Sequence, residues 1–231
     1  MAESTDTSRG FVENFDDFDR KVIDITNRWT TNSDTGGTAF AINDQTNGVI
    51  RGGVDTDDND LTNLFDFVDF RLDESPATVE WRAKTVTSVA NGETFIGVTD
   101  SNSTDENPIT LSAADVQTSN ATDAAGFAYT GGGTGNWKAV AVKTDSDLTP
   151  VACNVGGATT PIVGTWQTFK MVFSTEGHCR FFIDGREQAF IENAVSPTVL
   201  LNAGICVQGG TTARSLDVDY RYVKHGRRMT A

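Results

Sequence analysis

Apolar and polar residues alternate most clearly between residues 166 and 192. Phe169, Met171 and Phe173 alternate there with polar or smaller residues, which is the period of a half-buried strand. A second apolar run follows a glycine-containing turn, and Asp184-Gly185 then suits a two-residue hairpin because glycine tolerates the positive φ that such turns require. The stretch is therefore predicted to form three consecutive antiparallel strands.

Residues 77–87 form the clearest single strand. Val79, Trp81 and Ala83 share one face, and charged residues occupy the other. Asn91-Gly92 follows, and an Asn-Gly pair favours a two-residue hairpin turn. We therefore expect this strand to form a hairpin with residues 94–99.

Two late strands complete the pattern. Over 198–208 the buried face is predicted to be the one that holds Val199, Leu201, Ala203, Ile205 and Val207. Over 214–223 the alternation predicts an inward set, Leu216, Val218, Tyr220 and Tyr222, and an outward set, Asp217, Asp219 and Arg221.

The whole chain reads as about a dozen strands without an amphipathic helix. Residues 100–125 are polar and are expected to be a long loop, with a helical turn at 112–116. One closed double sheet is the simplest architecture. The expected organisation is a flexible N-terminal arm (1–10), a single β-sandwich domain (11–223) and a basic C-terminal tail (224–231).

Charge is distributed unevenly along the chain. The net charge is −14, and residues 1–75 account for −11 of it. An acidic surface disfavours nucleic acid and anionic membranes as partners. It favours either simple solubility or a contact with a basic partner surface. The basic residues after 223 are either solvated or dock onto an acidic neighbour.

Cysteine usage and the sequence start bear on the cellular environment. The chain has an odd number of cysteines, and they are widely spaced: Cys153, Cys179 and Cys206. We therefore expect buried free thiols instead of disulfides or a thiolate metal site. The first ten residues do not resemble a signal peptide, and no apolar run is long enough for a membrane helix. We therefore expect a soluble protein made in a reducing cytoplasm.

Catalytic chemistry is not indicated. Glycoside hydrolysis on a β-sandwich needs paired carboxylates on one strand. The nearest groups, Asp217 with Asp219 and the acids at 16, 17 and 19, are interpreted as outward-facing solvated acids. His178 and His225 lie far from any nucleophile motif. The sequence predicts a non-enzymatic protein with no catalytic residues and no cofactor.

A calcium loop is one open alternative. Asp55, Asp57 and Asn59 place oxygen side chains at loop positions 1, 3 and 5. Position 6 is Asp60 instead of glycine, and position 12 is Asp66 instead of a bidentate glutamate. An ordinary acidic surface loop is the other interpretation.

Tryptophans offer a second possibility, sugar stacking. Trp81 and Trp137 lie on apolar faces and are assigned to the core. Trp29 and Trp166 lie near strand ends, where exposure would let either stack on a sugar, although core packing is the alternative.

The strand order resembles the concanavalin A-like lectin and glucanase jelly roll. The resemblance rests on the strand from Trp166, the hairpin that contains FFIDGRE (181–187) and the closing strand LDVDY (216–220), and it covers roughly residues 11–223. It implies an all-β sandwich of two antiparallel sheets.

Within that fold the chain is similar to structural proteins of tailed-bacteriophage virions. The segments that carry this likeness are Phe15 to Phe18, Gly53 to Asp60, Val79 to Lys84, Gly97 to Asp100 and Phe181 to Gly185. The resemblance implies a capsid decoration or head-associated protein that is assembled in the host cytoplasm, located in the virion, bound to the major capsid protein or another virion protein, and homo-oligomeric. The alternative is a lectin-like domain that binds glycans.

Overall fold

The computed structural model describes residues 11–19, 22–44, 48–57, 60–67, 69–101, 106–133, 135–157 and 160–226. The described residues form strands and connections without a helix. None of them makes a helix that could cross a lipid bilayer. The expected arm at 1–10 lies outside the described residues, and so do residues 227–231 of the expected tail.

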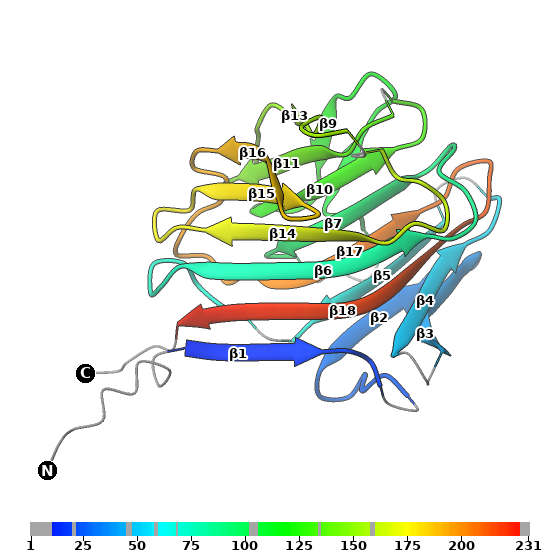
Figure 1. Ribbon diagram of the computed structural model, residues 1–231, viewed down its shortest axis with the longest axis horizontal. Helices are drawn as coiled ribbons and strands as arrows, with labels where there is room; N and C mark the ends of the chain where they lie inside the picture. The colour runs from blue at the N-terminus through cyan, green and yellow to red at the C-terminus, as the bar shows by residue number, and fades with distance from the viewer. Residues whose placement is uncertain are drawn as a thin grey trace, which may run out of the picture.

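Two large antiparallel sheets lie face to face (Figure 1). In order, the first sheet contains β16 (Arg186–Ile191), β15 (Cys179–Ile183), β14 (Gln167–Phe173), β6 (Ala77–Thr85), β18 (Arg214–Gly226), β4 (Val49–Val54) and β3 (Gly37–Asp44). The edge strand β1 (Phe11–Asp16) pairs with the second half of β18. Because β18 runs to Gly226, the sandwich extends three residues past position 223.

The second sheet completes the sandwich. In order, it contains β12 (Ser146–Asp147), β11 (Lys138–Lys143), β10 (Ala124–Thr130), β7 (Glu93–Thr99), β17 (Asn202–Gln208), β5 (Leu61–Asp66) and β2 (Trp29–Ser33), and β13 (Val151–Ala152) pairs with β11. The predicted two-sheet, all-β architecture is confirmed.

The core between the sheets follows from the alternation in the sequence. Trp81 on β6 and Phe169 on β14 are buried there as predicted. Phe169 packs against Phe127 of β10 and against Trp137, the residue before β11, at ring-centroid distances of 5.3 and 4.7 Å. Asp184 and Gly185 adopt φ values of 50° and 76°, so the late hairpin turns as the sequence indicates.

The predicted hairpin at Asn91-Gly92 is wrong. Asn91 does turn the chain, with φ of 47°, but β6 belongs to the first sheet and β7 to the second. The connection therefore crosses from one sheet to the other. Turn chemistry is local, and it cannot show which strand becomes the hydrogen-bonded neighbour.

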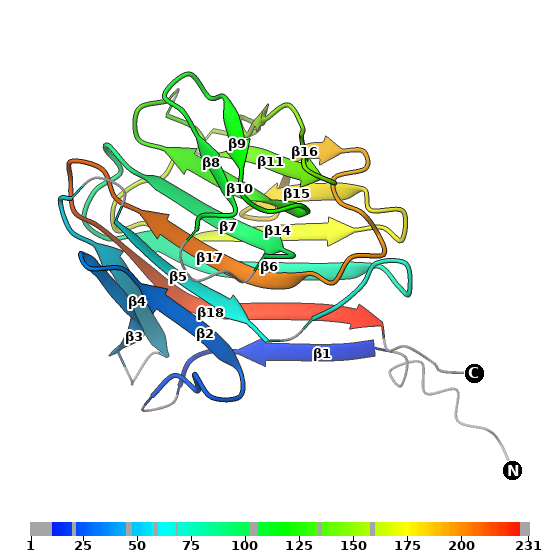
Figure 2. The same ribbon diagram turned by 180° about the vertical axis from the view of Figure 1, so that it is seen from behind.

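The segment 100–125 contains structure that was not expected. β8 (Ile109–Leu111) and β9 (Gln117–Ser119) pair with each other and lie over the outer face of the second sheet (Figure 2). We call residues 109–119 the flap. Ser112 and Val116 close a non-helical turn in which the Ser112 amide donates to the Val116 carbonyl, at 2.9 Å.

The flap also buries the face of β17 that was predicted to be exposed. Cys206 lies on the face that was predicted to be exposed, yet it is buried in a second apolar cluster with Phe95, Ile109 and Leu111. Both faces of β17 are therefore covered, one by the first sheet and one by the flap.

A β-bulge at Asp219 changes which residues of the last strand face inward. Val218 pairs with Ala83, while Tyr220 pairs with Arg82, so Asp219 is an extra residue. The alternation reverses after it. Arg221 is therefore buried between the sheets, while Tyr220 and Tyr222 lie half-buried on the outer face, opposite to the prediction.

Candidate functional site

Loops from both sheets meet at the end of the sandwich opposite the chain ends, on the right in Figure 1. They are the β4–β5 loop, the β6–β7 connection, the β10–β11 turn and the β17–β18 loop. Backbone and side-chain hydrogen bonds join them. Gly209 N donates to Asp60 O (2.6 Å), Asn91 Nδ2 donates to Thr211 Oγ1 (3.1 Å), and Gly131 N donates to Gly92 O (2.9 Å).

A polar hollow of about 340 Å³ lies among these loops. Its side chains are amides, hydroxyls and one carboxyl, from Asn91, Glu93, Thr130, Gln208 and Thr211, and glycines at 92, 132, 209 and 210 supply the remaining wall. A Cβ on Gly210 would lie 2.2 Å from the Asn91 carbonyl oxygen. Glycine is therefore required for the two loops to approach, and the wall consists largely of bare backbone.

Burial shifts the pKa values of two charged residues at the hollow. Glu93 begins β7, and desolvation raises its pKa to about 7, although the Leu111 amide and nearby Arg214 act in the opposite direction. Arg214 begins β18 and is buried, and desolvation lowers its pKa to about 10. Its Nη1 donates to Thr94 Oγ1 (3.2 Å). A protonated Glu93 both donates and accepts hydrogen bonds, which suits hydroxyl-rich ligands.

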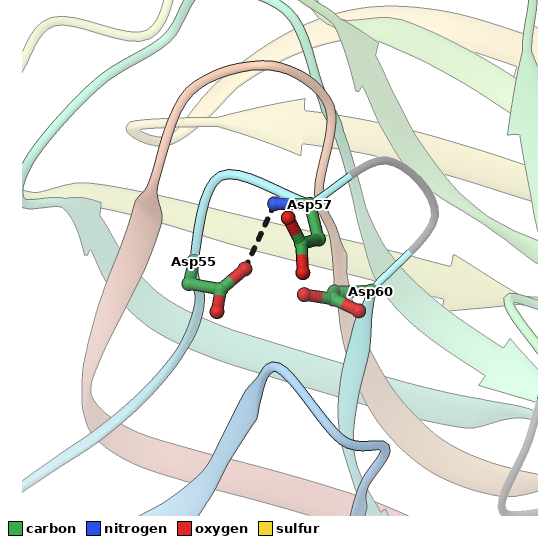
Figure 3. A group of neighbouring side chains, drawn as sticks. All are labelled: Asp55, Asp57 and Asp60. Atoms are coloured by element: carbon green, nitrogen blue, oxygen red, sulfur yellow. Dashed lines mark hydrogen bonds between the residues drawn. The ribbon is translucent and has the colours of Figure 1, made fainter.

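Asp55, Asp57 and Asp60 form an acidic triad (Figure 3). The triad lies next to the hollow, because the amide of Gly209, a residue of the hollow's wall, donates to the Asp60 carbonyl oxygen. One carboxylate oxygen from each residue lies within 4.8 Å of the others. A single calcium ion with oxygen ligands at about 2.3–2.6 Å could contact all three. The chemistry of the donors thus fits a hard cation.

Two carboxyl groups of the triad, those of Asp55 and Asp60, have opposite pKa shifts. Asp55 Oδ1 accepts a hydrogen bond from the Asp57 amide (2.8 Å), which lowers the pKa of Asp55. A hydrogen bond with Asp55 raises the pKa of Asp60 to about 6, helped by burial and by the charge of Asp34. Asp55 and Asp57 lie together as the spacing indicated, whereas Asn59 lies outside the described residues. Asp60, which the sequence pattern treated as a mismatch, completes the group.

Two of the acids that were expected to be solvated are buried and paired, whereas Asp17 and Asp19 are exposed as predicted and Asp219 is half-buried. Asp217 accepts from Arg51 Nε (2.6 Å) and lies 3.3 Å from Lys84 Nζ. Asp16 pairs with Arg28 and accepts from Trp29 Nε1, each at 3.0 Å. The prediction of outward solvated acids is wrong for these two, because neighbouring strands supply cations that the linear sequence does not reveal.

The tryptophan assignments are settled in part. Trp81 and Trp137 are core residues as predicted, and Trp29 is also buried. Trp166 is half-buried, with Lys84 Nζ 4.5 Å and Arg82 Cζ 4.8 Å from its ring centroid. All three cysteines are buried free thiols, as expected.

Two phenylalanine rings cover a row of glycines on the outer face of the second sheet. Gly204, Gly97 and Gly126 lie side by side on neighbouring strands. A Cβ on Gly204 would come within 2.4 Å of the Phe65 ring, and one on Gly126 within 2.8 Å of the Phe95 ring. The two rings occupy this glycine row, and both are fully buried.

Comparison with known proteins supports the fold. No protein-family model and no curated protein matches the chain. Among solved structures, the Emp47p carbohydrate recognition domain aligns with a TM-score of 0.61 at 15% identity, over 97% of this chain and 100% of that one. LamAcat from Zobellia galactanivorans gives 0.64 at 14%, over 94% and 98% of the two chains. The Bacillus licheniformis β-glucanase gives 0.61 at 10%, also over 94% and 98%.

These likenesses define the class of fold. The chain is a concanavalin A-like jelly roll, the fold of lectin carbohydrate-recognition domains and of glucanases. The resemblance to phage virion proteins has no counterpart among these structures and stays a prediction.

Proposed function

We propose that this chain is a carbohydrate-binding domain and that the polar hollow at its loop end holds the glycan. The main support is the lining of the hollow, where amides, hydroxyls and bare backbone converge in a space at the small end of the usual range for ligand sites. The fold likeness to a carbohydrate recognition domain and to glucanases adds support.

Binding without hydrolysis is the more consistent form of this proposal. Among the described residues that line the hollow, Glu93 is the one carboxyl group. Glycoside hydrolysis generally uses two flanking carboxyl groups. The proposed role therefore assigns Glu93 to ligand hydrogen bonding.

A glycan array followed by calorimetry tests the proposal. Neutral oligosaccharides, with laminaritriose included, should give at least one ligand of micromolar to millimolar affinity. Thr211→Val keeps the side-chain shape and removes one hydroxyl, so it should weaken binding by about tenfold. Thr78→Val, on the outer face of β6, is the matched control and should bind like the parent chain. Equal affinities for the two variants, or an array without ligands, would refute the proposed site.

The virion role stands as a second proposal. It rests on the sequence resemblance and on a solvent-facing first sheet with exposed aromatic residues, Phe11, Phe15 and Phe190. The two roles are compatible if the domain displays glycan-binding loops on a particle. Densitometry of purified particles, scaled to the major capsid protein, would give its copy number, and absence from particles would reject this role.

A further inference from the structure

Gln208, at the end of β17, is a side chain of the polar hollow whose orientation is set by a buried neighbour. Its Oε1 accepts a hydrogen bond from Asn107 Nδ2 at 3.4 Å. Asn107 precedes the flap and is buried, and its backbone carbonyl oxygen accepts from Asn120 Nδ2 at 3.0 Å. An anchored residue outside the lining therefore sets the direction of the Gln208 amide.

The two amides have one favourable arrangement. In it, the atom that is left buried without a partner is Asn107 Oδ1. If both amides were turned by 180°, Asn107 Nδ2 would be buried without an acceptor instead, and this nitrogen carries two N–H donors. Buried N–H groups without acceptors are rarer in proteins than carbonyl oxygens without donors. The Gln208 amide therefore keeps Oε1 toward Asn107 and turns Nε2 away from it.

The same wall of the hollow offers hydrogen-bond donors that the protein does not use. Gln208 Nε2 makes no hydrogen bond within the described part of the chain, and it is not one of the buried atoms that lack a partner. Thr211 Oγ1 accepts from Asn91 Nδ2 at 3.1 Å, so the Thr211 hydroxyl proton stays available. Two side chains from the end of β17 and the β17–β18 loop can thus donate to a ligand.

Asn91 supplies an acceptor beside these donors. Because its Nδ2 donates to Thr211, its Oδ1 is the amide atom left for a ligand. Asn91 is exposed on the β6–β7 connection and lines the same hollow as Gln208 and Thr211. A ligand group that accepts two hydrogen bonds and donates one would satisfy all three side chains.

A secondary amide has this combination of one acceptor oxygen and one donor. Its carbonyl oxygen has two lone pairs and can only accept, and its N–H can only donate. A sugar hydroxyl can do either, so it would not be selected by this arrangement. A carboxylate has no proton for Asn91 and would lie beside Glu93 and the acidic triad. The buried Arg214 donates to Thr94 and Ala90 and is not part of the lining.

We infer that the polar hollow selects an N-acetylated sugar, and that Gln208, held by Asn107, recognises the acetamido carbonyl oxygen. This inference rests on the proposed function, because it names the class of glycan for the same site. The acetamido oxygen would accept from Gln208 Nε2 and Thr211 Oγ1, and the acetamido N–H would donate to Asn91 Oδ1. Asn107 acts through Gln208 and is a positioning residue.

Calorimetric titration of the full chain with two matched pairs of sugars tests this inference. Tri-N-acetylchitotriose and cellotriose differ only in the acetamido groups at C2, and so do N-acetylgalactosamine and galactose. In at least one pair, the N-acetylated member should bind about tenfold more tightly.

The outcomes separate this inference from the proposed function. If neither pair favours its N-acetylated member while any sugar still binds, the inference is overturned and the proposed glycan site stands. Tighter binding of trigalacturonic acid than of the N-acetylated sugars would also overturn it, because the donors would then select a carboxylate. A chain that binds no sugar refutes both proposals.

Gln208→Met assigns the selection to one side chain. It keeps the length of the side chain and removes the N–H donors, so it should weaken binding of the N-acetylated sugar about tenfold and leave its unacetylated partner unchanged. Glu192→Met, at an exposed position outside the hollow, is the control and should keep the preference of the parent chain. The same preference in Gln208→Met would overturn the inference.

Asn107→Asp tests the positioning role. A carboxylate at this position would accept from Gln208 Nε2 and leave Oε1 to face the hollow, so the preference for the N-acetylated sugar should fall about tenfold. The readout is the ratio of the two affinities, because a loosened fold would weaken both sugars alike. Circular dichroism shows whether the variant is folded. An unchanged ratio in the folded variant would overturn the role of Asn107.

Discussion

Among single residues, Glu93 makes the loop end sensitive to pH. Its pKa is about 7 in the folded chain against 4.5 for an ordinary glutamate. The folded state therefore holds a proton that the unfolded state releases between about pH 4.5 and 7. The contribution of this group to stability is fully present below pH 4.5 and is lost as the pH rises through 7.

Glu93→Gln should flatten that dependence. Glutamine mimics the protonated side chain and retains the oxygen that accepts from the Leu111 amide at 3.3 Å. We expect the free energy of unfolding of the parent chain, relative to the variant, to fall by roughly 1–3 kcal/mol between pH 4.5 and 8. Urea denaturation across this range measures the difference. Parallel curves for the two chains would contradict the assigned protonation.

The acidic triad predicts cation binding that is linked to protons. Calcium needs ionised carboxylates, and Asp60 has a pKa of about 6. Calorimetric titration with CaCl₂ should show tighter binding at pH 7.5 than at pH 5, and Asp60→Asn should bind more weakly than the parent at pH 7.5. Exposed Asp145→Asn is the control. No binding below about 1 mM calcium would leave the triad as an ordinary acidic surface.

At the scale of elements, the bulge in β18 places an ion pair in the core. It turns Arg221 inward, where the guanidinium pairs with Asp66 at the end of β5 and lies 4.9 Å from the Trp29 ring centroid. Both paired side chains are fully buried, so the contact ties the first sheet to the second. Removing one partner would leave a charge without compensation in the core.

Arg221→Met should therefore destabilise the fold by about 3–5 kcal/mol. The double variant R221M/D66N should be less destabilised than the sum of its single variants, because the two groups interact directly. Arg180→Met, in the exposed pair with Glu187, should cost about 1 kcal/mol or less. Chemical denaturation of the four variants tests the coupling, and additive single-variant effects would argue against it.

The flap is a second element whose role can be tested. Leu111 is buried against Phe95 and Cys206, whereas Val116 at the flap's turn is 61% exposed. Leu111→Ala should cost about 2–5 kcal/mol, and Val116→Ala less than about 0.5 kcal/mol. Similar midpoints for the two variants in thermal unfolding would mean that the flap does not stabilise the second sheet.

The alternation of apolar and polar residues predicted which face of a strand is buried, but it did not predict which strands pair with each other. Val79, Trp81 and Ala83 lie inward as their spacing indicates, because a regular strand has period 2. The rule fails at Asp219, where one extra residue shifts the period, and at Asn91, where the same turn chemistry serves a crossing between sheets. Of the site, Asp55 and Asp57 were recognisable from spacing. The polar hollow was not, because its loops are far apart in sequence and only the fold assembles them.

At the scale of the whole molecule, the three cysteines probe different parts of one cooperative structure. Cys179 lies between the sheets, Cys206 lies under the flap, and burial raises the pKa of Cys153 to about 12. The thiolate is the reactive form, so all three should resist a disulfide reagent in the folded chain.

Labelling with 5,5′-dithiobis(2-nitrobenzoate) should therefore release about three equivalents only on unfolding, with one common rate. Leu111→Ala provides the contrast, since a loosened flap should expose Cys206 first. Early reaction of any thiol in the parent chain would show that its region opens independently of the rest.

The pairing of β1 with β18 brings Phe11 opposite Gly226, so the first and last strands of the sandwich start and finish next to each other. Because these two strand ends are adjacent, short linkers are enough to connect the domain to another polypeptide. The domain is thus suited to insertion into a surface loop of a host protein, or to circular permutation through a short bridge between residues 226 and 11. In such a graft the loop end would project away from the point of attachment.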